Sequence, residues 1–183
     1  KGVSPKAQIY MLRVCDASGL CFEDDMIAAM EYAVNNLSAK IMSISIGGGN
    51  FNYHCDFDPL AAKVNWVVDS GYTVIIAAGN EGSGVSSPAC ASKAIAVGAV
   101  DKTGTVPWWS NRGSALDILA PGVNIFYTYS CLAVGNCDSY WYAFSSGTSM
   151  ATPQISGVVA LLLETKPTLT TTQIKELLYS TTN

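Results

Sequence analysis

Apolar stretches of strand length alternate along the chain with stretches in which apolar residues recur at helical spacing. One helical stretch places Ile27, Met30, Val34 and Leu37 on a single face. The predicted strands are Gln8–Val14, Ile41–Ile46, Thr73–Ala78, Ala94–Val100 and Ile118–Ala120, and a second helix is predicted over Leu60–Ser70. The third of these strands is almost wholly apolar, as expected when both faces of a sheet are covered. The alternation predicts an α/β fold with a mostly parallel sheet and right-handed crossovers.

The sequence pattern in the last third of the chain predicts a hairpin around Phe126–Phe144, a long helix over Thr148–Glu164 and a final helix from Thr171. The start of the final helix is marked by local sequence alone. Thr170 and Gln173 form a capping box, and Leu169 and Ile174 occupy the positions of a hydrophobic staple.

Composition narrows the class of protein. The 183 residues, of which 49% are hydrophobic and 13% charged, fit one folded domain over residues 1–183 and exclude a disordered chain. The net charge is −4 and basic residues form no cluster, so nucleic acid is not an expected partner. The uncharged run 139–163 is long enough to cross a membrane, but glycine, proline and hydroxyl residues interrupt it, so a buried segment of a soluble protein is expected.

Six cysteines indicate an oxidising compartment. Cys15 and Cys21 bracket one short turn, and Cys131 and Cys137 bracket another, so each pair is placed to close its own loop. Cys55 and Cys90 then remain for each other. A secreted or cell-surface protein is expected. The cysteines have no zinc-site spacing and His54 is the single histidine, so no metal site is expected within the chain.

Small and glycine-rich segments follow the predicted strands, at the edge of a parallel sheet where ligands bind. Ser149 falls in the first turn of the long helix, where free N–H groups and the helix dipole favour a developing negative charge. Asn80 follows the strand Thr73–Ala78 and is placed to donate its amide into the same region. Each residue also has a purely structural interpretation, Ser149 as part of a helix start and Asn80 as a turn residue. The glycine spacing around Asn80 does not match a nucleotide-binding loop, and no phosphate-binding lysine follows.

Several motifs, in order, resemble those of the subtilisin-like serine proteases, the subtilases. The most specific is Gly147–Pro153, which is similar to the nucleophile motif of that family. Further similarities are Ala78–Gly82 with the oxyanion segment, Ser43–Gly48 with the substrate-binding strand, and Ala96–Val100 and Leu119–Gly122 with core landmarks. The resemblance covers the whole chain and about the last two-thirds of a subtilase catalytic domain. It implies a three-layer α/β fold that is incomplete at its N-terminal side.

The resemblance also implies roles for individual residues. Ser149 would be the nucleophile of a serine endopeptidase, and Asn80 would help to hold the oxyanion. An extended polypeptide substrate would pair with Ser45, Ile46 and Gly47, while Ala77, Ala78 and Gly79 would wall the pocket for the residue before the cut. The segments around Cys55 and Cys90 resemble a pattern in secreted bacterial subtilases, which supports their pairing.

The chain departs from the family in the other two residues of the catalytic triad, the aspartate and the histidine that activate the serine. The family order is Asp, His, Ser, and the motifs of the first two are expected upstream of Lys1. Asp69–Gly71 mimics the aspartate motif at the wrong place, a helix end, and His54 lacks the histidine motif. The first hypothesis is therefore a secreted endopeptidase whose upstream segment completes the triad, with the isolated chain inactive. The alternative is a catalytically dead domain used for binding or structure.

Three further expectations follow from this interpretation. No cofactor is expected to be required, and any calcium site is expected in the full-length parent. Glu81 near the pocket favours a basic residue before the cut. An exposed sheet edge would let the isolated chain associate with itself or with the upstream segment.

Overall fold

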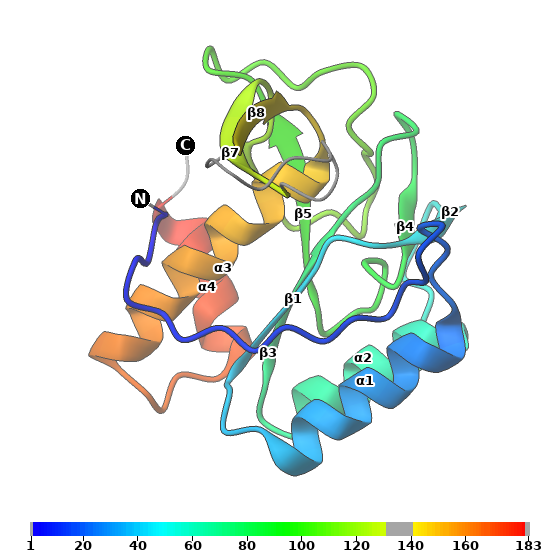
Figure 1. Cartoon of the computed structure of the whole chain (residues 1–183), viewed down its shortest axis with the longest axis vertical. Helices are drawn as coiled ribbons and strands as arrows, with labels where there is room; N and C mark the ends of the chain where they lie inside the picture. Colours follow the sequence, from blue (N-terminus) through cyan, green and yellow to red (C-terminus); the bar gives the residue numbers. More distant parts are fainter. Residues whose placement is uncertain (1, 131–140, 182–183) are drawn as a thin grey trace.

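A parallel sheet of four strands forms the centre of the molecule, seen here in a computed structural model that describes residues 2–130 and 141–181 (Figure 1). The strand order is β1-β3-β5-β6, and each neighbouring pair is parallel. The strands span Ile41–Ile44, Thr73–Ala77, Ile95–Val100 and Ile118–Pro121 respectively. The predicted α/β fold with a parallel sheet is confirmed.

Helices cover both faces of this sheet, so the described chain has three layers (Figure 1). On one face lie α1, Glu23–Asn36, and α2, Pro59–Asp69, with one hydrophobic core cluster between them and the sheet. On the other face lie α3, Thr148–Thr165, and α4, Thr171–Thr181, with a second cluster. Strand β3 is buried along its entire length because its alternate side chains enter the two clusters.

The segment Gln8–Val14 is not a strand, so this prediction is wrong. It is non-helical and runs across the molecule without ladder hydrogen bonds to β1 (Figure 1). Among the described strands β1 pairs only with β3, so its other edge is open. Ile9 and Met11 are 80% and 85% exposed. The apolar pattern of a strand is present, but the segment forms no ladder with this open edge of β1.

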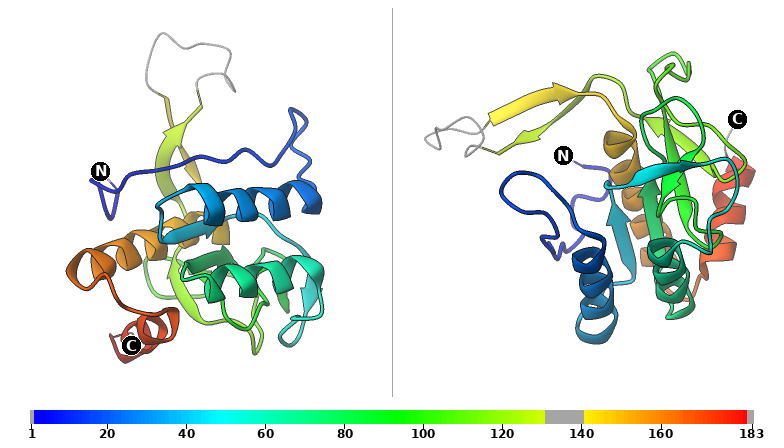
Figure 2. Two further views of the ribbon diagram at one scale, coloured as in Figure 1. Left: turned by 90° about the horizontal axis from the view of Figure 1, so that it is seen from below. Right: turned by 90° about the vertical axis from the view of Figure 1, so that its right-hand side faces the viewer.

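Two short pairs of strands lie outside the main sheet. Strand β2, Gly48–Phe51, pairs antiparallel with β4, Val85–Ser87, and the two strands follow β1 and β3 along the chain. The sequence did not predict this pair because Gly48 and Gly49 interrupt any alternation. Strands β7, Ile125–Tyr129, and β8, Trp141–Ser145, form the predicted hairpin, which projects from the body of the molecule (Figure 2).

Two disulfides confirm the pairing expected of Cys15 with Cys21 and of Cys55 with Cys90. The first closes a short loop before α1. The second joins the segment before α2 to the segment after β4. Cys131 and Cys137 lie outside the described residues.

The predicted start of α4 is confirmed in detail. The Thr170 N–H donates to Gln173 Oε1 at 3.0 Å, the Gln173 N–H donates to Thr170 Oγ1 at 3.3 Å, and Leu169 and Ile174 both join the second core cluster. We expect Thr170→Ala to lower the free energy of unfolding by about 1 kcal/mol, because one helix N–H loses its acceptor. Urea denaturation should show this change, with the exposed Thr172→Ala as the control. An equal loss in both variants would contradict a role for the cap.

Candidate active site

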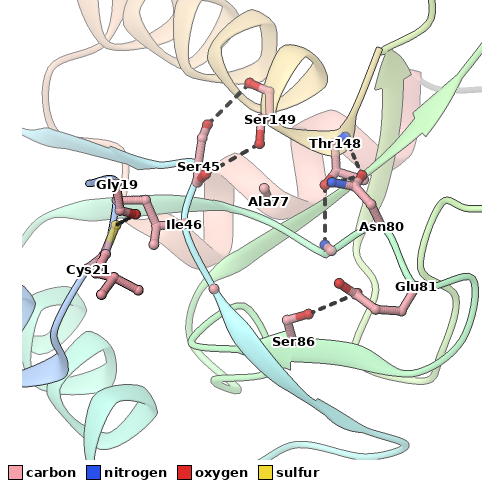
Figure 3. A pocket seen from close by; sticks show the side chains of 13 residues that line it. Gly19, Cys21, Ser45, Ile46, Ala77, Asn80, Glu81, Ser86, Thr148 and Ser149 are labelled. Atoms are coloured by element: carbon pink, nitrogen blue, oxygen red, sulfur yellow. Dashed lines mark hydrogen bonds between the residues drawn. The ribbon is translucent and has the colours of Figure 1, made fainter. Parts of the chain in front are cut away.

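The ends of β1 and β3 meet the start of α3 at one edge of the sheet, and a cavity of about 450 Å³ lies there (Figure 3). This is the carboxyl edge of the parallel strands, where chain segments from separate parts of the sequence converge. The residues that line the cavity come from four segments: Gly19, Leu20 and Cys21; Ser45, Ile46 and Gly47; Ala77, Gly79, Asn80, Glu81 and Ser86; and Thr148 and Ser149.

Ser149 lies in the first turn of α3 and faces the segment that follows β1 (Figure 3). Its Oγ donates a hydrogen bond to the Ser45 carbonyl oxygen at 3.3 Å. In return, Ser45 Oγ donates to the Ser149 carbonyl oxygen at 3.2 Å. That carbonyl is available because residue 153 is a proline, which lacks the N–H that would have bonded it within the helix. A pair of hydrogen bonds thus joins the serine to the segment beside it.

The Asn80 side chain is oriented by Thr148. Asn80 Oδ1 accepts from the Thr148 N–H at 2.9 Å and from Thr148 Oγ1 at 3.1 Å. Thr148 Oγ1 also accepts from the Gly79 N–H at 3.2 Å, so the threonine contacts both the backbone and the side chain of this loop. With its oxygen held in this way, the Asn80 amide group has Nδ2 left for another acceptor.

Two N–H donors converge beside Gly147. A Cβ atom built on this glycine would lie 3.7 Å from Asn80 Nδ2 and 3.7 Å from the Ser149 backbone nitrogen. The Ser149 nitrogen is at the N-terminus of α3, where the helix dipole adds positive potential. A pair of donors near a hydroxyl nucleophile is what stabilises the oxyanion in acyl transfer.

The segment Ser45–Gly47 offers a peptide backbone to the cavity. Gly47 lies so close to the neighbouring strand that a Cβ atom would be 2.7 Å from the Ser87 carbonyl oxygen. Glycine is therefore required at this position, and the surface beside it is mainly main chain. An extended peptide binds to such an edge by adding a strand.

The structure brings most of the predicted site residues together, with one exception. Ala78 is fully buried in the first core cluster and does not line the cavity. Sequence reasoning missed the Cys15–Cys21 loop, which contributes Gly19, Leu20 and Cys21 to the wall. The paired cysteines were visible in the sequence, but nothing there indicated that their loop reaches the site.

Neither of the other triad-like residues is at the cavity. Asp69 ends α2 and forms an ion pair with Lys93 at 2.6 Å. His54 is exposed beside the Cys55–Cys90 disulfide, with its Nδ1 at 3.2 Å from the Cys90 carbonyl oxygen. Burial raises the pKa of the nearby Asp56 carboxyl, but hydrogen bonds from Ser92 and Asn65 outweigh it and hold this pKa below its usual value. His54 and Asp56 thus form a surface group apart from the cavity.

The charge of the cavity is carried by Glu81, the one ionisable side chain among its described lining residues. Ser86 Oγ donates to Glu81 Oε2 at 3.4 Å (Figure 3). Within residues 2–130 and 141–181, no group of three or more His, Cys, Asp or Glu side chains is placed to hold a metal ion. In the same residues, no helix combines the length and the apolar character needed to span a membrane.

A serine at a helix N-terminus, a carboxamide beside it and a cavity at the carboxyl edge of a parallel sheet together define a protein of the serine-hydrolase type. Comparison with known proteins specifies the family. The whole chain, residues 1–183, matches the subtilase family of peptidases. The chain belongs to this family.

Individual relatives agree with this assignment. The chain is 38% identical over 185 residues to subtilisin amylosacchariticus of Bacillus subtilis subsp. amylosacchariticus, covering 98% of this chain and 45% of that protein. It is 37% identical to the subtilisin of Bacillus pumilus, covering 98% of this chain and 62% of that protein. The crystal structure of a cold-adapted subtilisin-like serine proteinase matches with a TM-score of 0.77 and 30% identity over 92% of this chain and 57% of that one. The chain therefore spans about half to three-fifths of the length of these relatives.

Proposed function

We propose that this chain supplies the nucleophile, the oxyanion site and the substrate-binding strand of a secreted serine endopeptidase. The observation that carries the proposal is the convergence of Asn80 Nδ2 and the Ser149 N–H beside Gly147, next to the Ser149 hydroxyl. A binding module has no need of two nitrogen donors held within 3.7 Å of one position beside a hydroxyl. Homology to the subtilisins supports the same reaction class.

In the proposed reaction, Ser149 Oγ attacks the carbonyl carbon of the scissile peptide bond and loses its proton to a general base. The carbonyl oxygen becomes an oxyanion, which accepts hydrogen bonds from Asn80 Nδ2 and the Ser149 N–H. Collapse of this intermediate expels the amine, which takes up the proton, and leaves an acyl group on Ser149. Water then attacks the acyl group with the help of the same base, and the serine is regenerated.

The general base and its aspartate come from outside these 183 residues. His54 does not line the cavity and Asp69 is paired with Lys93, so residues 2–130 and 141–181 offer neither partner at the site. The hydrogen bond of Ser149 Oγ to the Ser45 carbonyl does not activate the serine, because an amide oxygen is too weak a base to take its proton. In the complete protease a histidine replaces this contact. We propose that the isolated chain is inactive for this reason.

The test is covalent labelling with a fluorophosphonate, which reacts with activated serines. One adduct at Ser149 in the complete protein, and none in the isolated 183-residue chain, is the expected result by intact mass. A complete protein that is folded but unlabelled would favour the alternative, a catalytically dead domain used for binding. Labelling of the isolated chain would mean that its own residues activate Ser149.

The substrate is a polypeptide in extended conformation, held along Ser45–Gly47. We expect Glu81 to favour lysine or arginine before the cut, because it places the one negative charge in the described cavity wall. Glu81→Gln should lower kcat/KM for a lysine substrate about fivefold and change it less than threefold for leucine, since an exposed charge pair contributes at most about 1 kcal/mol. Glu31→Gln, on an exposed face of α1, serves as the control. A wild-type preference for aromatic or aliphatic residues would contradict this prediction.

The location, partners and cofactor needs of the protein follow from the same interpretation. The two disulfides fit an extracellular protein, and we propose secretion or display at the cell surface. The open edge of β1 is the place where an upstream strand, or a second copy of the isolated chain, would add to the sheet. We propose that the reaction needs no cofactor and that calcium, where it binds, binds to the complete protein.

A further inference from the structure

Asn111 occupies the loop between β5 and β6 and has no exposed surface. It lies far from Asn80 in the sequence, yet its side chain and backbone contact the segment around Asn80 on both sides. Buried asparagines carry two donors and two acceptor positions that must all be satisfied. The partners that satisfy them show which part of the molecule this residue fixes.

On the far side of Asn80, the Asn111 carboxamide oxygen accepts two backbone hydrogen bonds. The Glu81 N–H donates to Oδ1 at 2.7 Å and the Gly82 N–H donates at 2.8 Å. Asn111 Nδ2 also donates to Glu81 Oε2 at 2.8 Å. The turn that follows Asn80 is therefore held at two consecutive amides and at one side chain.

On the near side of Asn80, the same residue holds the end of β3. Asn111 Nδ2 donates to the Ala78 carbonyl oxygen at 2.9 Å, and the Asn111 backbone N–H donates to the Gly79 carbonyl oxygen at 3.1 Å. A weaker contact from Nδ2 reaches Ser86 Oγ at 3.3 Å. Gly79 makes this approach possible, because a Cβ atom there would lie 2.3 Å from Asn111 Nδ2. Its φ of +107° is also unfavourable for any residue with a side chain.

We infer that Asn111 is a positioning residue for the oxyanion donor. It holds the backbone before and after Asn80 without contacting Asn80 itself, while Thr148 holds the Asn80 side chain. The two sets of contacts fix the direction of Asn80 Nδ2 from opposite ends. Because preorganised donors stabilise an oxyanion best, a loosened loop lowers the rate of the chemical step. The inference rests on the proposed function.

The first test is a kinetic cycle in the complete protease. Asn111→Ala should lower kcat roughly 30-fold with KM changed less than about threefold, because the loop is loosened while the binding strand is untouched. In an Asn80→Ala background the same substitution should cost less than about threefold, since the donor that Asn111 positions is already gone. An equal loss of kcat in both backgrounds, or no loss in either, would overturn the inference.

Ser110→Ala provides a matched control. Ser110 is the neighbouring residue, is also fully buried, and its Oγ accepts from the Ala99 N–H at 2.9 Å, a bond directed into β5 rather than toward Asn80. This variant should be destabilised in the same way but should keep kcat within about threefold in both backgrounds. A loss of kcat in Ser110→Ala as large as in Asn111→Ala would identify general destabilisation as the cause and overturn the inference.

The second test does not depend on activity. Amide hydrogen exchange at Glu81 should be at least tenfold faster in Asn111→Ala than in the wild type, and unchanged in Ser110→Ala. The Gly82 N–H also donates to the Trp109 carbonyl oxygen at 2.8 Å, so it should stay protected in both variants. Unchanged exchange in Asn111→Ala would overturn the inference even if kcat fell. A third outcome combines faster exchange in Asn111→Ala with a wild-type complete protein that fluorophosphonate does not label. It would show that Asn111 holds the loop but that the proposed function is wrong, and it would overturn the catalytic role of Asn111.

Discussion

Replacing Ser149 by alanine in the complete protease is expected to abolish peptide-bond hydrolysis and covalent labelling together. The hydroxyl belongs to the residue whose own N–H lies with Asn80 Nδ2 beside Gly147 at the cavity. The loss should be on the order of 10⁶-fold in kcat, a magnitude established for the corresponding serine of subtilisin rather than obtained from this structure. A progress curve with a sensitive peptide substrate, read against an uncatalysed control, measures it.

The variant should remain folded and should still bind substrate. Ser149 Oγ makes one hydrogen bond, to the Ser45 carbonyl oxygen at 3.3 Å, so its removal should change the free energy of unfolding by no more than about 1 kcal/mol. Ser156→Ala, farther along α3, removes a hydroxyl bonded to Ser43 Oγ at 2.9 Å and serves as the matched control. Full activity in Ser149→Ala, or an equal loss in Ser156→Ala, would contradict the role assigned to Ser149.

Replacing Asn80 by alanine is expected to lower kcat by roughly 10²–10³-fold while KM changes little. This magnitude too is established for the oxyanion amide of subtilisin and is not obtained from this structure. The physical reason is that Asn80 Nδ2 contacts the substrate oxygen most strongly when that oxygen carries charge, so its loss affects the transition state more than the bound substrate. Steady-state kinetics with one peptide substrate separates the two parameters.

Two comparisons sharpen the Asn80 result. Asn80→Asp keeps the oxygen that accepts from Thr148 but replaces the donor with a negative charge, so it should be at least as inactive as Asn80→Ala. Asn36→Ala removes an exposed carboxamide at the end of α1 and should leave kcat unchanged. A rise in KM with an unaltered kcat in Asn80→Ala would show that Asn80 stabilises the bound substrate and the transition state equally and is not an oxyanion donor.

Most of the fold could be predicted from the sequence because its elements are strongly marked. The buried strand Thr73–Ala77 has no polar interruption, and α4 begins at a capping box whose hydrogen bonds form as expected. The failure at Gln8–Val14 shows the limit of an apolar pattern: it indicates that a segment can pair, but this segment forms no ladder with β1, whose edge stays open. The β2–β4 pair was not predicted because Gly48 and Gly49 have no side chains that could form the alternating apolar and polar pattern of a strand.

The place of a side chain in the fold could be predicted from the sequence where the residue adjoins a clearly marked strand or helix. Ser149 follows the start of a helix and Asn80 follows a buried strand, and the structure places both at one cavity. Thr148 and Asn111 were missed for a different reason. Their importance lies in contacts between segments far apart in the sequence, and a single threonine or asparagine gives no local signal of a distant partner.

The contact between Asn80 and Thr148 joins residues separated by 68 positions along the chain. During synthesis the asparagine is therefore made long before the helix that orients it, and domains fold only as their residues become available. Until α3 has emerged and docked, the growing chain has neither a nucleophile nor a fixed oxyanion donor. Under the proposed function, proteolytic capacity would therefore arise only after α3 has docked.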